Sequence, residues 1–191
     1  MKITLDYNCL VSLKEKDGEH AEIKSLVELH PYHIVVFIPA IAASENQQGG
    51  RLHTNFDQFE QFLREIKCER CELLNPMWYW DVSYLDHMVV SDEQMVSFER
   101  EIHDILFPNI PFEYPEYCRR FGLNVDDGTI KRKWRNAKCD VQAMWCHIQY
   151  GNDIFVTQDG NFLKATKKRK LVVLGAQKIL RPKQCLSQLK A

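Results

Sequence analysis

Four acidic residues stand where an α/β protein collects its chemistry. Asp6 directly follows a short apolar run at the start of the chain, and Asp159 closes the sequence Ile-Phe-Val-Thr-Gln-Asp. Glu45 follows a second, β-branched run, and Asp140 lies near the start of an apolar segment with helical spacing. Because functional groups gather at the carboxyl ends of parallel strands, we expect three of these acids at one edge of a sheet and Asp140 on a helix that leans over it.

Carboxylates gathered in this way repel one another, and each raises the pKa of its neighbours unless something neutralises them. Mg²⁺ and Mn²⁺, which prefer hard oxygen ligands and retain water, would do so. A metal ion held by carboxylates activates water and stabilises the leaving oxygen in phosphodiester hydrolysis. Taken singly, each acid is more often a helix cap or a turn residue, so the prediction depends on the joint pattern.

The elements that must position these acids alternate between strands and helices. Fully apolar runs predict strands buried on both faces, and apolar residues at helical spacing predict amphipathic helices. A Ser-x-x-Gln capping box at Ser91 marks one helix start. We expect strands at 3–6, 34–38, 71–74, 154–157 and 171–174, and helices at 19–30, 55–66, 91–106 and 129–150, with a short helix at the C-terminus. Residues 107–128, rich in proline, aromatics and acids, are expected to be irregular. The alternation predicts a three-layer α/β/α fold with a mostly parallel central sheet.

Length and composition limit the class of protein. The chain has 191 residues, 45% of them hydrophobic and 27% charged, which suits one packed domain over residues 1–191 and excludes disordered and collagen-like classes. The longest nearly unbroken apolar run, 34–43, is far shorter than the ~20 residues of a membrane helix. The N-terminus carries no apolar signal segment, so we expect a soluble, cytoplasmic protein with no membrane partner.

The formal net charge of −1 conceals a strong asymmetry. Residues 1–127 hold 11 basic against 23 acidic side chains, whereas residues 128–191 hold 14 basic against 3 acidic ones. Such segregation suits a polyanion partner, because phosphate contacts depend on local basic patches and not on the total charge. Mutual neutralisation across the folded surface explains the asymmetry equally well.

The seven cysteines have an odd count and no disulfide-scaffold spacing. We expect reduced thiols, several of them in the core. Cys68 and Cys71 have the spacing of half a zinc site or of a redox pair, but no second such pair follows, which favours a structural role.

The positions of these residues resemble those of the PIN-domain nucleases. The matching features are Asp6 after the first strand, Glu45 after the second, Asp140 in Cys-Asp-Val-Gln-Ala-Met-Trp, and the sequence Thr-x-Asp-x-Asn-Phe that starts at Thr157. The stretch 173–182 is similar to that family's closing strand and tail. The resemblance covers most of the chain in the correct order, although each motif is short.

The resemblance implies an endoribonuclease that cuts single-stranded RNA with Mg²⁺ or Mn²⁺ bound by the four acids. Asn161 stands where many members carry another acid, which implies a supporting ligand through water or a weaker second metal site. The insertion around residues 76–130 is longer than in compact toxin members, so it could form a lid, a specificity surface or a face for a partner. Family members also imply a homodimer or an antitoxin-like protein inhibitor.

Other polar residues near these acids are candidates for supporting roles. Asn8, Ser44 and Thr157 could hydrogen-bond to the ligands, although turn, cap or strand roles explain them as well. Two basic clusters border the acids and could guide phosphates toward the metal. The candidates for nucleic-acid contact are Lys131, Lys133, Arg135, Lys138, Lys164 and Lys167. Trp134, inside the first cluster, is more often a buried helix residue than a base-stacking one.

Two further functions compete with the nuclease. A catalytically weak or inactive RNA-binding or scaffold protein would keep the fold, and Asn161 and the long insertion favour it. A phosphoryl-accepting or nucleotide-binding α/β domain would also place acids at strand ends, but the sequence lacks a glycine-rich phosphate loop.

Overall fold

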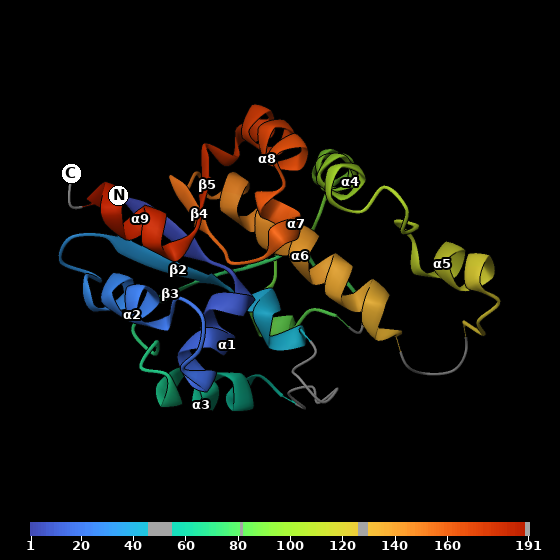
Figure 1. Ribbon diagram of the computed structural model, residues 1–191. Helices are drawn as coiled ribbons and strands as arrows, with labels where there is room; N and C mark the ends of the chain where they lie inside the picture. The colour runs from blue at the N-terminus through green and yellow to red at the C-terminus, as the bar shows by residue number, and fades with distance from the viewer. Residues whose placement is uncertain (46–54, 81, 126–129, 190–191) are drawn as a thin grey trace.

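The computed structural model describes residues 1–45, 55–80, 82–125 and 130–189 (Figure 1). The described residues form a five-stranded, all-parallel sheet in the order β3-β2-β1-β4-β5. Helices cover both faces, so the predicted α/β fold with a parallel sheet is confirmed. The strands are β1 (Lys2–Leu5), β2 (Val35–Pro39), β3 (Glu72–Leu74), β4 (Ile154–Val156) and β5 (Lys178–Leu180).

The strands are apolar on both faces because each face is covered by helices. In β4, Ile154 and Val156 belong to one buried cluster, whereas Phe155 between them belongs to the other. In β2, Val36 and Ile38 belong to the first cluster and Phe37 packs against the second, whereas in β1 the buried polar Thr4 lies between Ile3 and Leu5 of the first cluster. The continuous apolar runs in the sequence therefore reflect two separate cores.

One face of the sheet is covered by helices from both ends of the chain. Helices α1 and α9 each pack against α2, and α9 also contacts β4. The aromatic side of α3 contributes Phe59 and Phe62 to the same cluster. These helices are α1 (Tyr7–Glu15), α2 (His20–Glu28), α3 (Phe56–Glu65) and α9 (Pro182–Leu189).

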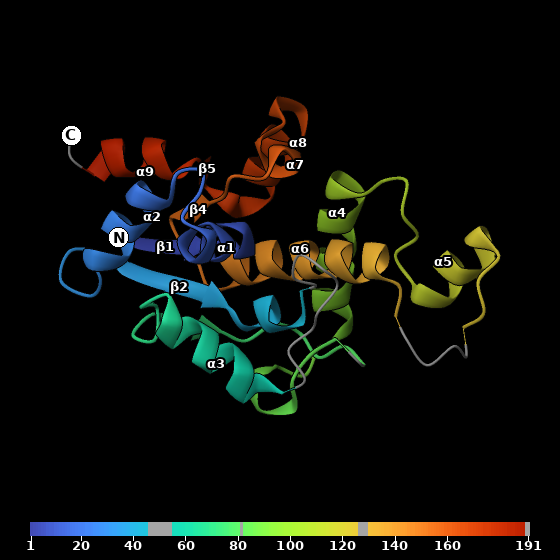
Figure 2. The ribbon, with the colours of Figure 1, turned by 60° about the horizontal axis from the view of Figure 1, so that its bottom comes forward.

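The other face is organised around α6 (Arg132–Gln149), which carries the fully buried Trp134 and Trp145. It packs against α4 (Glu93–Leu106), and α4 in turn contacts α8 (Ala165–Leu171). Figures 1 and 2 show that the N-terminal half of α6 extends beyond the sheet toward α5 (Tyr114–Phe121). The segment before α4 contains the short helix η2 (Leu85–His87).

The sheet reverses its direction of winding between β1 and β4. From β1 the chain proceeds outward through β2 to β3, and from β4 it proceeds in the opposite direction to β5. The carboxyl ends of β1 and β4 therefore frame a topological switch point, which is where open α/β sheets leave a crevice for a ligand. Asp6 follows β1 directly, and Asp159 follows β4 by three residues.

Three local predictions are wrong. Helix α4 begins one residue later than the Ser91 box implies, because the Asp92 side chain accepts the hydrogen bond from the Met95 amide. The segment expected to be irregular contains α5, which starts near a proline and ends at Gly122 in the left-handed region. The expected strand 171–174 is instead the end of α8 and the π-helical η3 (Val172–Ala176), and the last strand, β5, comes later.

The last of these errors has a clear physical origin. The lysine-rich α8 continues directly into the apolar residues, and Val173 is 83% exposed, so the run does not lie in the sheet core. The turn ends at Gly175, whose φ of 116° is accessible to glycine. Only after this turn does the chain re-enter the sheet.

Two predictions about the chain as a whole can be compared with the described residues. All seven cysteines are buried free thiols. No helix in the described ranges is long and apolar enough to cross a membrane.

Candidate functional site

Asp6 lies at the centre of a hydrogen-bond network at the switch point. The residue is 2% exposed. One carboxylate oxygen accepts from the Tyr7 amide at 2.8 Å, and the other accepts from Thr157 Oγ1 at 2.6 Å and from Asn8 Nδ2 at 2.5 Å. This network fixes the orientation of the carboxylate before any ligand binds.

The same network joins the ends of β1 and β4. Thr157 Oγ1 accepts from the Asp159 amide at 2.9 Å while its own proton goes to Asp6. Asn8 Oδ1 accepts from the Gln158 amide at 3.0 Å. Asn8 and Thr157 therefore support the candidate ligands directly, and they couple the position of Asp6 to that of Asp159.

Asp159 has a structural contact of its own. It caps α7 (Gly160–Leu163), because its Oδ1 accepts from the Asn161 amide at 2.8 Å. The cap occupies one carboxylate oxygen and directs the side chain to the edge of the sheet. Of the two roles that the sequence presents as alternatives, the structure shows the cap, and the second carboxylate oxygen takes no part in it.

Glu45 and Asp140 approach the same place from the two other elements. Glu45 is half-buried and directly follows the short helix η1 (Ala40–Ser44), which continues β2. Asp140 lies in the middle of α6, and α6 packs against η1. The four acids therefore come from four separate segments, as the sequence predicts.

A pocket of about 580 Å³ opens at this edge of the sheet. Glu45, Asp140 and Asp159 line it, whereas Asp6 lies behind its wall. The other lining residues are Tyr7, Asn8, Val11, Ser12, Asp17, Gly18, Arg132, Asn136 and Gln158. We call this the acid pocket.

Electrostatics in the acid pocket are dominated by negative charge. Burial and repulsion from Asp159, opposed by the hydrogen bonds from Thr157, Tyr7 and Asn8, together raise the pKa of Asp6 to about 6. Burial followed by repulsion from Asp6 and Asp159 holds the pKa of Glu45 well above its usual value. Burial and then Glu45, Asp6 and Asp159 do the same for the pKa of Asp140. The charges acting on these three acids are thus other carboxylates.

The donor set suits a hard divalent cation, because it consists of carboxylate oxygens that are costly to keep charged without one. Among the residues that the structure describes, no group of three or more His, Cys, Asp or Glu side chains is arranged so that it could hold a metal ion.

Asn161 does not join the four acids. Its side-chain oxygen accepts from Lys167 Nζ, and its amide lies 3.5 Å from the Leu106 carbonyl. Lys167 also donates to that carbonyl at 2.5 Å, so its ammonium holds α8 to the end of α4. The structure thus gives both residues a structural contact, and their predicted metal and nucleic-acid contacts stay predictions.

Two other predicted residues are engaged elsewhere. Ser44 Oγ donates to the Val82 carbonyl and not to an acid. Lys138 is 1% exposed and its Nζ lies 2.9 Å from Glu99 Oε1, with the Phe112 ring centroid 3.8 Å away. The prediction that Lys138 contacts a nucleic acid is wrong, because α6 turns this position into the core.

The remaining predicted cations lie nearer the surface. Lys133 and Lys164 are exposed, whereas Lys131 and Arg135 are partly buried. Trp134, between them, is fully buried, and its indole N–H donates to the Pro111 carbonyl at 3.0 Å. The interpretation of Trp134 as a core residue is confirmed.

Several pocket residues were missed by sequence reasoning. Arg132, Asn136 and Asp140 line the acid pocket together because they are four residues apart on one helix face. That spacing is visible in the sequence and could have identified the first two. Asp17 and Gln158 carry no comparable signal, since their place depends on how the turn after α1 packs against the end of β4.

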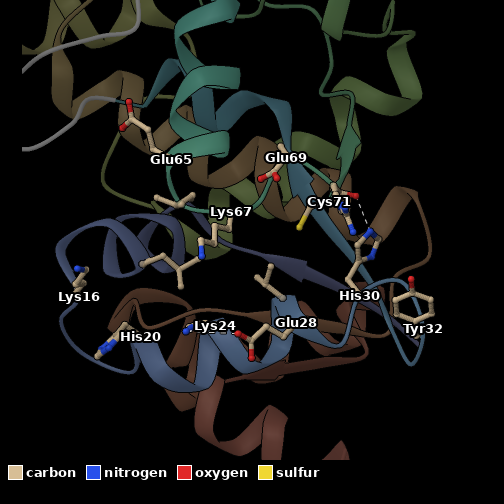
Figure 3. Close-up of a pocket in the computed structure, with 14 residues that line it drawn as sticks. Lys16, His20, Lys24, Glu28, His30, Tyr32, Glu65, Lys67, Glu69 and Cys71 are labelled. Carbon is tan, nitrogen blue, oxygen red and sulfur yellow. Dashed lines mark hydrogen bonds and ion pairs between the residues drawn. The ribbon is translucent and has the colours of Figure 1, made fainter.

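A second and larger pocket, of about 710 Å³, lies between α1, α2 and the turn that follows α3 (Figure 3). Its charged rim includes Lys24, Glu28 and Lys67, and Cys71 lies at its base. His30 donates to the Arg70 carbonyl at 2.7 Å, which ties this helix layer to the start of β3. None of the four candidate acids lines this pocket, so its size does not make it the candidate site.

Comparisons with known proteins leave the family open. No protein-family model matches the chain, and no curated protein matches it. The fold is similar to the crystal structure of VapBC2 from Rickettsia felis bound to a DNA fragment from their promoter, with 14% identity, a TM-score of 0.45, and coverage of 95% of this chain and 98% of that one. At this level of similarity the match does not assign an activity.

Proposed function

We propose that this chain is a metal-dependent endoribonuclease that hydrolyses phosphodiester bonds of single-stranded RNA at the acid pocket. Mg²⁺ or Mn²⁺ would be held by Asp6, Glu45, Asp140 and Asp159. When bound, the cation would supply activation of water and stabilisation of the departing oxygen. The choice of RNA as substrate rests on the resemblance of the four-acid pattern to PIN-domain nucleases.

The observation that carries the proposal is the mutual repulsion of the carboxylates gathered at the switch point. The pKa values of Asp6, Glu45 and Asp140 are all raised by burial and by neighbouring acids. A protein that needed these acids only as caps would gain nothing from placing them together, because each raises the cost of ionising the others. A divalent cation removes that cost.

The other residues of the pocket have defined supporting roles in this proposal. Thr157 and Asn8 hold the Asp6 carboxylate in one orientation. Tyr7 lines the pocket, and burial together with the charge of Glu45 raises the pKa of its phenol, so the hydroxyl keeps its proton and can donate it in a hydrogen bond. These contacts orient ligands and substrate without changing protonation themselves.

The test is cleavage of a labelled single-stranded RNA with Mn²⁺ by the wild type, by Asp6→Asn and by Asp140→Asn. We expect at least ~100-fold slower cleavage by each variant, since each loses a ligand that the cation needs. Asp57→Asn, an exposed acid on α3, is the matched control and should cleave at the wild-type rate.

Two results would contradict the proposal. Equal cleavage by the wild type and both pocket variants would show that the carboxylates do not carry the reaction. RNA binding that EDTA leaves unchanged, with no cleavage of any substrate, would instead favour the non-catalytic RNA-binding protein, for which the structural contact of Asn161 with Lys167 is the supporting observation.

A further inference from the structure

Arg132 occupies a distinctive place at the acid pocket. It begins α6 and lies on the same face as Asn136 and Asp140, at intervals of four residues. With a rise of ~1.5 Å per residue, its Cα is ~12 Å along the helix axis from that of Asp140. The face therefore leads from the carboxylates outward along the part of α6 that extends beyond the sheet (Figure 2).

The charge of Arg132 is not used to neutralise the pocket. Among the described residues that line the acid pocket it is the one lysine or arginine, facing the acids Asp17, Glu45, Asp140 and Asp159. In the part of the chain that the structure describes, none of these four acids forms an ion pair with it. The charges that act on Asp140 are likewise all carboxylates.

Two other basic residues, Lys138 and Lys167, are less available to bind a substrate at this pocket. Lys138 is buried against Glu99, and Lys167 is bound to the Leu106 carbonyl and to Asn161. Arg132 is exposed, and a guanidinium presents a planar fork of donors that matches a phosphate with two parallel hydrogen bonds. A cation at the rim of an anionic pocket also offsets the repulsion that a polyanion meets there.

We propose that Arg132 binds a phosphate of the single-stranded RNA next to the one that is hydrolysed, so that the strand leaves the acid pocket along the N-terminal half of α6. This inference rests on the proposed function for the identity of the substrate. The inference adds the direction in which the RNA leaves the acid pocket and assigns Arg132 to its positioning. Arg132 itself takes no part in the chemical step.

The experiment measures binding and cleavage separately. Affinity for a short fluorescein-labelled single-stranded RNA is measured by fluorescence anisotropy over a range of salt concentrations, with Ca²⁺ present and the RNA checked for integrity on a gel. The proteins are the full-length wild type, Arg132→Ala, Arg132→Lys, and Arg64→Ala as a matched control on α3 that does not line the pocket. Because Arg132 is exposed, its substitution removes no core contact.

We expect Arg132→Ala to raise Kd by about 10-fold, as for the loss of one charge-assisted contact. The slope of log Kd against log salt should fall by about 0.7, the value for one phosphate contact on a single strand. Arg132→Lys should keep the slope while losing part of the affinity, and Arg64→Ala should match the wild type.

Cleavage with Mn²⁺ then separates the two proposals. With Arg132→Ala, we expect KM to rise by about the same factor as Kd while kcat stays within about twofold. A wild type that does not bind the RNA, or an Arg132→Ala variant whose Kd and salt slope equal those of Arg64→Ala, overturns the inference even if the enzyme cleaves. Binding with the expected salt slope but without cleavage overturns the nuclease and supports the path along α6.

Discussion

At the scale of single residues, the Asp140 carboxylate is needed as a ligand in the proposed function but lowers the stability of the metal-free protein. Its pKa is raised by burial and by the neighbouring carboxylates, so the folded protein keeps this proton to a higher pH than the unfolded chain does. Stability is therefore lost as the pH rises through the folded-state pKa. In metal-free buffer at pH 8, we expect Asp140→Asn to melt about 2–4 °C above the wild type, equivalent to about 1 kcal/mol.

Thermal scans in EDTA measure this difference directly. Glu101→Gln removes an equal charge from the exposed surface of α4, away from the helix ends, and should leave the melting temperature unchanged. An Asp140→Asn protein that melts at or below the wild-type temperature would show that the carboxylate is stabilising in the apo protein. The electrostatic argument for a cation site would then fail.

His147 gives protein stability the opposite pH dependence. Its ring is fully buried, accepts from Thr4 Oγ1 at 2.9 Å and donates from Nε2 to the Ala176 carbonyl at 3.0 Å. Burial lowers its pKa to about 4, whereas an unfolded histidine titrates near ~6.5. The unfolded chain therefore binds more protons between these values, and stability is lost as the pH falls from about 6.5 to 4.

Urea unfolding at pH 7 and pH 5 tests this contribution. Between these two values the wild type should lose about 2 kcal/mol more stability than His147→Gln, in which no imidazole can titrate. The comparison between proteins cancels the titration of the acid pocket. Equal losses in the two proteins would mean that His147 takes up the same number of protons in the folded and unfolded states between these pH values, so that burial does not lower its pKa.

Single residues also show how far the sequence determines the site. The four acids could be located from the sequence because three follow strand ends and the fourth lies in a helix of apolar pattern. Lys138 could not be assigned, because its burial depends on Glu99, which lies in another helix 39 residues away. The contact of Asn161 with Lys167 could not be predicted for the same reason, since Lys167 belongs to the next helix.

At the scale of elements, Lys167 connects α8 to α4. Its ammonium donates to the last residue of α4, Leu106, where a helix leaves its carbonyls unpaired. We expect Lys167→Ala to cost about 1–2 kcal/mol of unfolding free energy and to speed amide hydrogen exchange in α8. Denaturant titration and hydrogen-exchange mass spectrometry measure the two effects.

Lys164 provides the matched control for this connection. It lies three residues earlier and is exposed, so Lys164→Ala should change neither quantity. If both variants behave alike, the contact between α8 and α4 does not depend on the ammonium group. The packing of the two helices would then be due to their apolar side chains alone.

A helix or strand could be predicted where its own residues show a clear apolar pattern. Strands β2 and β4 could be placed because buried strands between two helical layers are apolar throughout, β1 because Ile3 and Leu5 precede Asp6, and α3 because its aromatic residues recur at helical spacing. The run at 171–174 is equally apolar and yet helical, because the preceding lysine-rich helix extends into it and Gly175 ends the turn. Apolar composition over so few residues does not distinguish a strand from a helix end.

At the scale of the whole molecule, the basic third of the sequence does not form one surface. Lys138 is buried and Lys167 is bound to α4, so these charges serve the fold. The first turn of α6 and the lysine-rich α8 lie apart, with α4 between them in Figure 2. Part of the charge asymmetry in the sequence therefore serves the fold. A phosphate contact is better assigned to a single exposed residue, Arg132, than to the total charge of this third of the chain.

The acid pocket joins segments that are far apart in the chain: the end of β1, the residue after η1, the middle of α6 and the end of β4. A cation that binds all four acids can bind only the folded chain, so it must stabilise the whole molecule by mass action. At a concentration of about 100 times Kd the gain is about 2.7 kcal/mol, which raises the melting temperature by about 5–10 °C.

Thermal scans with increasing Mn²⁺ and then with excess EDTA check this expectation. The shift should increase with the logarithm of Mn²⁺ concentration above Kd and disappear with the chelator. It should be absent in the Asp6→Asn, Asp140→Asn double variant, which lacks two of the four ligands, and intact in Asp57→Asn. If the melting temperature of the wild type does not respond to Mn²⁺ or Mg²⁺, the four acids do not bind a divalent cation, and the proposed metal site is wrong.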